Sequence, residues 1–244
     1  MSNSKRSTLA TVAAVVVVAL VAVLVGVEVY ARNRATTCLA QSLESELGTG
    51  VDVDLSWKPV LLQLIDKKVP SVTLTSDDSA FGPAQGMTVH AVAKDVDLNA
   101  TADTAGTIGS SRAEVVWPAS GILATVQSQG LGTLVSAVTP DAAAGTLSFT
   151  VAGSLAEFTV RPVAQGGVVT VETVDASVLG IGLPTALVDG VVDILATGLQ
   201  QYPLGMQATA VSVDDNGVNL TLEGGSFTMP RPQENAQQQT CSLI

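Results

Sequence analysis

The chain has 244 residues and a formal net charge of −11, and beyond residue 34 it carries 21 acidic but only seven basic side chains. So acidic a surface repels phosphate polymers, which argues against a nucleic-acid partner. Aromatic residues make up only 3% of the chain, which argues against a sugar-binding cleft of stacked rings and predicts an aliphatic core.

An apolar stretch over residues 9–30 contains no charge before Glu28. As a helix rising about 1.5 Å per residue it covers roughly 33 Å, close to the hydrocarbon thickness of a bilayer, and predicts a transmembrane anchor. Lys5 and Arg6 precede it, so we expect residues 1–8 in the cytoplasm and the rest of the protein outside, in a periplasm-like space. The alternative is a cleaved signal peptide, although signal peptides usually have a shorter apolar core.

Two cysteines, Cys38 and Cys241, bracket the exported part of the chain. An oxidising compartment permits a disulfide between them. It would close a loop of about 200 residues and stabilise the fold by roughly 5 kcal/mol at best in the chain-entropy model. We predict this disulfide, and the alternative is two unrelated thiols.

Residues 35–230 are predicted to form one extracytoplasmic domain, followed by a polar tail over residues 231–244. A short helix is expected over 35–47, and helical spacing of apolar residues recurs over 119–138 and 185–199. Short alternating stretches predict strands at 51–55, 70–76, 87–99, 112–117, 145–152, 154–162, 167–174, 176–179, 211–213, 218–222 and 227–229. Many short strands with a few amphipathic helices indicate an α+β fold, with a curved antiparallel sheet wrapped around a helix.

The segment from Ser56 to Lys68 combines an indole, aliphatic side chains and lysines. This combination is typical of a membrane interface or of a site for a lipid headgroup. The alternative is a core helix whose lysines reach solvent. The predicted lipid-binding residues of this segment are Trp57, Lys58, Leu61, Leu62, Leu64, Ile65, Lys67 and Lys68.

The helix predicted over 185–199 has one apolar face and begins after Pro184. We predict that this face and the aliphatic residues of the first segment together line an apolar pocket for acyl chains, with Trp57 and the lysines at its entrance. The same helix could equally be plain core. Its predicted lining residues are Leu187, Val188, Val191, Val192 and Leu195.

No catalytic constellation stands out in the sequence: nucleophile elbows, phosphate loops, zinc spacings and dinucleotide fingerprints are absent. His90 is the only histidine, so a metal site or a triad would have to rely on it alone. The run Asp214-Asp215-Asn216-Gly217 predicts a hairpin turn rather than a calcium loop. We therefore expect a protein that is not an enzyme and has no cofactor or metal. A structural or partner-binding domain without a ligand cavity is the alternative to lipid binding.

Several short motifs follow one another along the chain: the anchor, a helix ending Glu-Leu-Gly, Val51-Asp52-Val53, the stretch Trp57 to Ile65 with Pro59, Val72-Thr73-Leu74, Gly182-Leu183-Pro184 and Asp215-Asn216-Gly217-Val218. Their order resembles the actinobacterial phospholipid-binding proteins of the lipomannan elongation factor type. The likeness covers most of residues 35–230. It implies a cell-envelope protein that binds phospholipid, shaped like half of a bactericidal/permeability-increasing (TULIP-like) protein, with an apolar tunnel and a link to the maturation of mannosylated lipoglycans.

Overall fold

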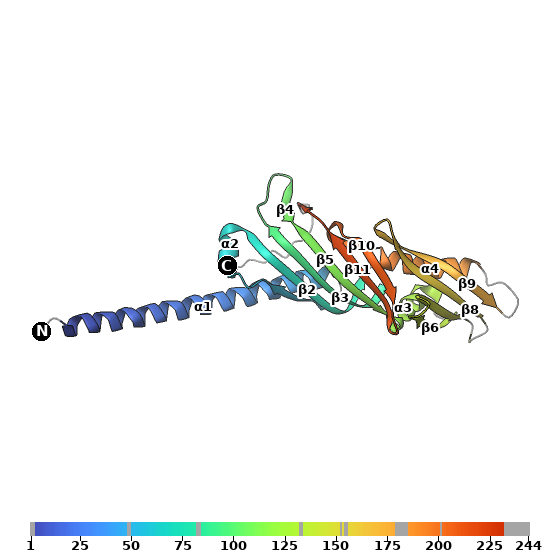
Figure 1. Ribbon diagram of the computed structural model, residues 1–244, viewed down its shortest axis with the longest axis horizontal. Coiled ribbons are helices and arrows are strands. Elements are labelled where there is room, and N and C mark those ends of the chain that lie inside the picture. The colour runs from blue at the N-terminus through green and yellow to red at the C-terminus, as the bar shows by residue number, and fades with distance from the viewer. Residues whose placement is uncertain are drawn as a thin grey trace.

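The computed structural model describes residues 3–47, 50–81, 84–131, 134–151, 153, 156–178, 185–200 and 202–231. Within them the predicted α+β class is confirmed: helices pack against two antiparallel sheets, and one long helix projects from the domain (Figure 1). The helices are α1 (Asn3–Leu47), α2 (Val60–Asp66), α3 (Ala119–Val126) and α4 (Thr185–Leu199), with short helical turns η1 (Gln127–Leu131) and η2 (Pro203–Gly205).

The larger sheet, sheet A, has eight strands in the order β1-β2-β3-β5-β11-β10, with β4 paired to β3 and β12. The smaller one, sheet B, has the order β6-β7-β8-β9. The strands of sheet A are β1 (Asp52–Leu55), β2 (Lys68–Phe81), β3 (Ala84–Asp97), β4 (Thr104–Ile108), β5 (Ser110–Pro118), β10 (Gln207–Val213), β11 (Gly217–Gly224) and β12 (Phe227–Pro230). Those of sheet B are β6 (Val135–Asp141), β7 (Thr146–Val151), β8 (Ala156–Gln165) and β9 (Val168–Val178).

The two sheets meet where β10 lies against β8 and β9. The N–H of Ala208 donates to the carbonyl of Gly167 at 2.8 Å across this boundary. Gly167 follows Gly166 in the β8–β9 turn, and both have positive φ, which glycine adopts without strain. These two glycines form the hairpin turn between β8 and β9, where Gln165 pairs with Val168.

The main hydrophobic core extends over both sheets and the helices α3 and α4. Trp117 is fully buried in it, and its Nε1–H donates to the carbonyl of Gln85 at 3.0 Å. In sheet B the rings of Phe149 and Phe158 stack with centroids 4.9 Å apart. A second, smaller cluster of Val69, Val96 and Ile108 lies at the other end of sheet A. Aliphatic side chains and a few aromatic rings therefore hold the domain together.

Three predicted elements differ in the structure. The anchor and the helix expected over 35–47 form one continuous helix, because neither glycine nor proline interrupts residues 31–47. The helical spacing over 119–138 ends early, and β6 begins at Val135 in its place. The two strands expected over 167–179 are the single strand β9.

Candidate functional site

The apolar side chains of α1 between residues 14 and 27 are exposed. The valine and leucine side chains from Val15 to Val27 are 46–67% exposed. By length and composition, one helix among the described residues could cross a membrane, over Ala14–Gln41, and a signal sequence near the N-terminus would have the same properties. From Glu28 onward α1 contacts the domain, mainly β1 and α2. The contacts between α1 and the domain thus begin at Glu28, the first charged residue after Arg6.

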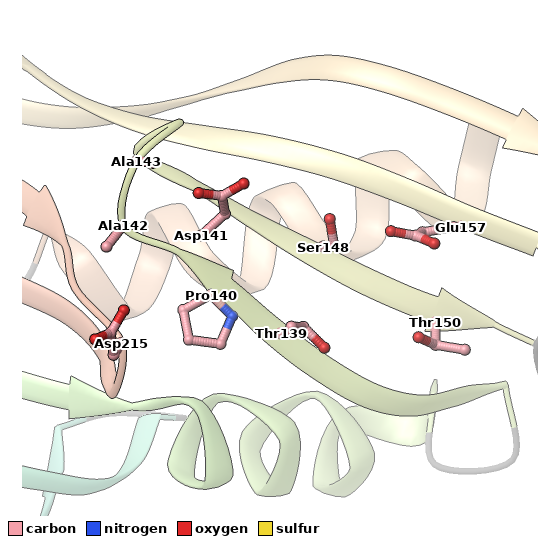
Figure 2. A pocket seen from close by; sticks show the side chains of 9 residues that line it. All are labelled: Thr139, Pro140, Asp141, Ala142, Ala143, Ser148, Thr150, Glu157 and Asp215. Carbon is pink, nitrogen blue, oxygen red and sulfur yellow. The ribbon is translucent and has the colours of Figure 1, made fainter.

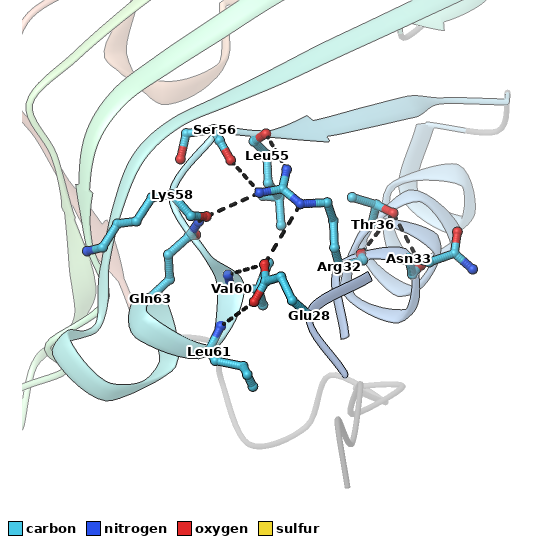
Figure 3. A network of polar contacts seen from close by, with 10 residues as sticks. All are labelled: Glu28, Arg32, Asn33, Thr36, Leu55, Ser56, Lys58, Val60, Leu61 and Gln63. Carbon is cyan, nitrogen blue, oxygen red and sulfur yellow. Dashed lines mark hydrogen bonds and ion pairs between the residues drawn. The ribbon is translucent and has the colours of Figure 1, made fainter. Parts of the chain in front are cut away.

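Glu28 and Arg32 of α1 join this helix to the segment before α2 and to its first turn, a set of contacts that we call the α1–α2 junction (Figure 3). The Glu28 carboxylate accepts the N–H of Val60 at 2.6 Å and that of Leu61 at 3.3 Å. The first N–H groups of a helix have no partner within the helix, and Pro59 in front of α2 has no side-chain acceptor. Glu28 therefore acts as the cap of α2 from 32 residues upstream.

Arg32 completes the junction from the next turn of α1. Its guanidinium donates to the carbonyl of Leu55 at 2.9 Å, that of Ser56 at 2.7 Å and that of Lys58 at 3.2 Å. Its Nε also lies 4.0 Å from the Glu28 carboxylate. A guanidinium has five fixed donors, which suits the simultaneous recognition of several carbonyl groups. The backbone of residues 55–61 is thus held on α1 at both ends.

The short helix α2 exposes most of its apolar side chains. Val60 and Gln63 are buried, whereas Trp57 just before the helix is 89% exposed and Ile65 is 79% exposed. Leu62 and Leu64 are each 51% exposed. We call Trp57, Leu62, Leu64 and Ile65 the α2 apolar surface. A core helix would bury these residues, so the arrangement favours the interface interpretation of this segment over the core one.

The lysines of this segment have different environments. Lys58 forms an ion pair with Asp66 and donates to the carbonyl of Lys68 at 3.1 Å. The hydrogen bond from Lys58 and that from the N–H of Lys68 lower the pKa of Asp66. Lys67 ends α2 in the left-handed conformation with a φ of 54°, and both Lys67 and Lys68 are exposed. Two exposed ammonium groups therefore border the α2 apolar surface.

The predicted lining residues of α4 lie elsewhere. Val188, Val191 and Leu195 are buried in the main core, and Leu187 and Val192 are half-buried against it. α4 packs on β9 and α3, at the end of the domain opposite to α2 (Figure 1). The structure thus does not bring the α4 residues to the α2 segment, because the strand order separates the two helices.

A second group of partly exposed apolar residues was not predicted from the sequence. Cross-strand pairs place Leu55, Val72 and Ala93 in one row, and Leu74 and Ala91 in the next row on the same face. That face also carries the buried residues of the main core, so it is the inner face of sheet A. All five side chains are half-buried. We call them the inner-face patch, and only the strand register reveals it.

A hollow of about 550 Å³ lies on sheet B and the β10–β11 turn (Figure 2). Three carboxylates and several hydroxyl groups surround it, an unsuitable lining for an acyl chain. It contains none of the predicted lipid-binding residues. Its lining residues are Thr139, Pro140, Asp141, Ala142, Ala143, Ser148, Thr150, Glu157 and Asp215.

The other candidate groups form no chemical site among the described residues. His90 is exposed, with its Nδ1 3.2 Å from the Thr75 hydroxyl, and no group of three metal-binding side chains is present in the described part of the chain. The turn at Asp214 is the predicted hairpin, since its carboxylate accepts the N–H of Asn216 at 2.8 Å and that of Gly217 at 3.0 Å. A hydrogen bond from the Asn219 side chain, together with these two backbone hydrogen bonds, lowers the pKa of Asp214. Cys241 lies outside the described residues, so its pairing with Cys38 stays a prediction.

Comparison with known proteins gives a family and several relatives. The model of the LmeA-like phospholipid-binding family matches residues 22–223. The uncharacterized proteins Mb0489c of Mycobacterium bovis and Rv0479c of Mycobacterium tuberculosis are each 28% identical over 217 residues, 87% of this chain. The match covers 62% of each relative, so the chain spans about three fifths of their length. No solved structure matches, and the resemblance to half of a bactericidal/permeability-increasing protein is not confirmed.

Proposed function

Because the chain belongs to the LmeA-like phospholipid-binding family, we propose that it is a membrane-tethered phospholipid-binding protein of the cell envelope. In this proposal residues 9–30 cross the membrane, residues 1–8 are cytoplasmic, and the domain over residues 35–230 lies outside. The observation that carries the proposal is the position of the α2 apolar surface, which adjoins the first charged residue after the apolar part of α1.

The headgroup would lie at the C-terminal end of α2. Lys67 and Lys68 are exposed there, and ammonium groups attract anionic phosphate. Trp57 supports the same location, because an indole combines an apolar ring with one N–H donor and is favoured at the boundary between hydrocarbon and water. Lys58 stabilises the end of α2 through Asp66 and would act indirectly.

The acyl chains would lie along the inner-face patch. A sixteen-carbon chain removed from water at about 0.8 kcal/mol per methylene contributes on the order of 10 kcal/mol, and it requires only an aliphatic surface. Small side chains at Ala91 and Ala93 allow close approach to the strands. The bound phospholipid would serve the maturation of envelope lipids or lipoglycans, as the resemblance to the lipomannan elongation factor type implies.

Native mass spectrometry of the full chain, released from detergent after purification from membranes, tests this function. We expect a co-purifying phospholipid that organic extraction removes and that added phospholipid restores. Ala93→Phe places a ring on the inner face and should lower lipid occupancy severalfold. Thr88→Phe places the same ring on the opposite, exposed face of β3 and should leave occupancy unchanged. A lipid-free protein of constant mass would refute the proposal and favour a structural or partner-binding domain.

The predicted disulfide is part of the proposal, because it would link α1 near the domain to the C-terminal tail. Peptide mapping without reduction should recover Cys38 and Cys241 in one cross-linked species. Two separately alkylated peptides from the unreduced protein would contradict the pairing.

A further inference from the structure

We propose that the α2 apolar surface inserts into the outer boundary of the same bilayer that α1 crosses, and that the α1–α2 junction fixes the domain in this orientation. The inference rests on the proposed membrane tethering. It adds an interaction surface and its partner, a phospholipid bilayer that is touched beside the anchor.

The first observation that supports this inference is the position of α2 along α1. Glu28 is the first charged side chain after Arg6 and lies near the end of the apolar stretch, so it marks the level near which α1 leaves the hydrocarbon. The N–H of Val60 lies 2.6 Å from its carboxylate. The first turn of α2 is therefore at the membrane boundary, and α2 lies at the end of the domain from which α1 projects (Figure 1).

The second observation is the set of exposed aromatic and apolar side chains near this membrane boundary. Trp57 and Ile65 are almost fully exposed, and Tyr30 on α1 is 71% exposed. Aromatic rings are enriched at the two faces of a bilayer, and exposed apolar clusters on a domain indicate an interaction. Lys67 and Lys68 add positive charge beside the cluster, which suits an anionic lipid surface. Two copies of this chain, each with a formal net charge of −11, would instead repel each other.

The third observation is the rigid connection between α1 and the domain. α1 continues without a break through Leu47 and packs on β1 and β2, with Ala35 buried. Together with the junction, this contact prevents α2 from turning away from the membrane while α1 stays in it. The orientation of the domain is thus set by contacts rather than by a flexible linker.

Tryptophan quenching by brominated phospholipid tests the inference on the full chain in vesicles of phosphatidylcholine and phosphatidylglycerol. Trp57 is exposed, whereas Trp117 is fully buried in the domain. The difference in emission between the wild type and Trp57→Phe therefore reports Trp57 alone. We expect this emission to be blue-shifted and at least twofold quenched by bromines near the lipid interface.

Two variants separate docking from tethering. Leu64→Asp with Ile65→Asp should lower the quenching of Trp57 severalfold, whereas Val174→Asp, which alters an exposed valine in β9, should leave it unchanged. Glu28→Gln with Arg32→Gln should lower quenching while the chain still floats with the vesicles. Docking would be overturned if the wild-type protein floats with the vesicles but its Trp57 emission has the wavelength of an indole in water. It would also be overturned if the blue shift of Trp57 increases with the amount of protein per vesicle and brominated lipid does not quench it, because Trp57 would then be covered by another protein molecule. Failure of the wild type to float would instead refute the proposed tethering.

Discussion

Replacing Glu28 with alanine tests whether a residue of α1 acts as the cap of α2. The substitution removes the acceptor of two backbone N–H groups, those of Val60 and Leu61. Loss of a helix cap costs about 0.5–2 kcal/mol, and hydrogen bonds to a charged group contribute about 1.5–3 kcal/mol. The Glu28 side chain is 21% exposed, so water replaces part of the loss. We expect a local destabilisation of about 1.5–2 kcal/mol.

Hydrogen exchange of the peptide that covers α2 measures this change directly. A destabilisation of this size corresponds to about 10- to 30-fold faster exchange of the Val60 and Leu61 amides. Glu28→Gln keeps a neutral acceptor and should give a smaller acceleration. Glu44→Ala, at an exposed position further along α1, serves as the control and should leave α2 unchanged. Equal protection of both amides in the wild type and in Glu28→Ala would refute the capping role.

Two further predictions concern the core and the end of α2. In Gly198→Ala the new Cβ would lie 2.8 Å from the Trp117 ring. Overpacking of the core costs about 1–3 kcal/mol, which exceeds the gain in helix propensity of at most about 1 kcal/mol. We therefore expect Gly198→Ala to lower the urea concentration at the midpoint of unfolding. Gly225→Ala, with no atom within 4 Å of its Cβ, should change the midpoint little. In the folded protein the hydrogen bond from Lys58 lowers the pKa of Asp66. The ionised Asp66 carboxylate therefore stabilises the fold above the unfolded pKa near 3.8, and this stabilisation is lost as the pH falls through the folded pKa. Thermal unfolding between about pH 5 and pH 2 should show this loss in the wild type and a weaker one in Asp66→Asn.

Local chemistry allowed much of the fold to be predicted. The β10–β11 hairpin follows from Asn216-Gly217 between two alternating strands, and α4 follows from its apolar periodicity. The helix predicted from the spacing of Leu134 to Val138 was wrong, because a short apolar run fits a helix and a buried strand equally well. There the pairing of β6 with β7, which involves distant residues, decides the conformation.

The candidate site was predictable only in part. The combination of Trp57 with aliphatic residues and lysines was visible in the sequence, but a core helix with lysines that reach solvent fitted it as well, and the exposure of these side chains is seen only in the structure. The separation of α2 from α4 was not visible, since it depends on the order of the strands between them. Glu28 lies within the predicted anchor over residues 9–30 and Arg32 directly after it. Their contacts could not be predicted from the sequence, because their partners are backbone groups that every residue possesses.

The α1–α2 junction also bears on the choice between a retained anchor and a cleaved signal. For a cleaved signal peptide, the small residue Ala31 in Val29-Tyr30-Ala31 would serve as the cleavage site. A cut there would remove Glu28 and leave the first N–H groups of α2 without their acceptor. It would also release a domain whose α2 apolar surface faces water. Retention of α1 avoids both costs, because the same residues that end the apolar stretch stabilise the fold of the next segment. The contacts of Glu28 therefore favour an anchor that remains part of the folded protein.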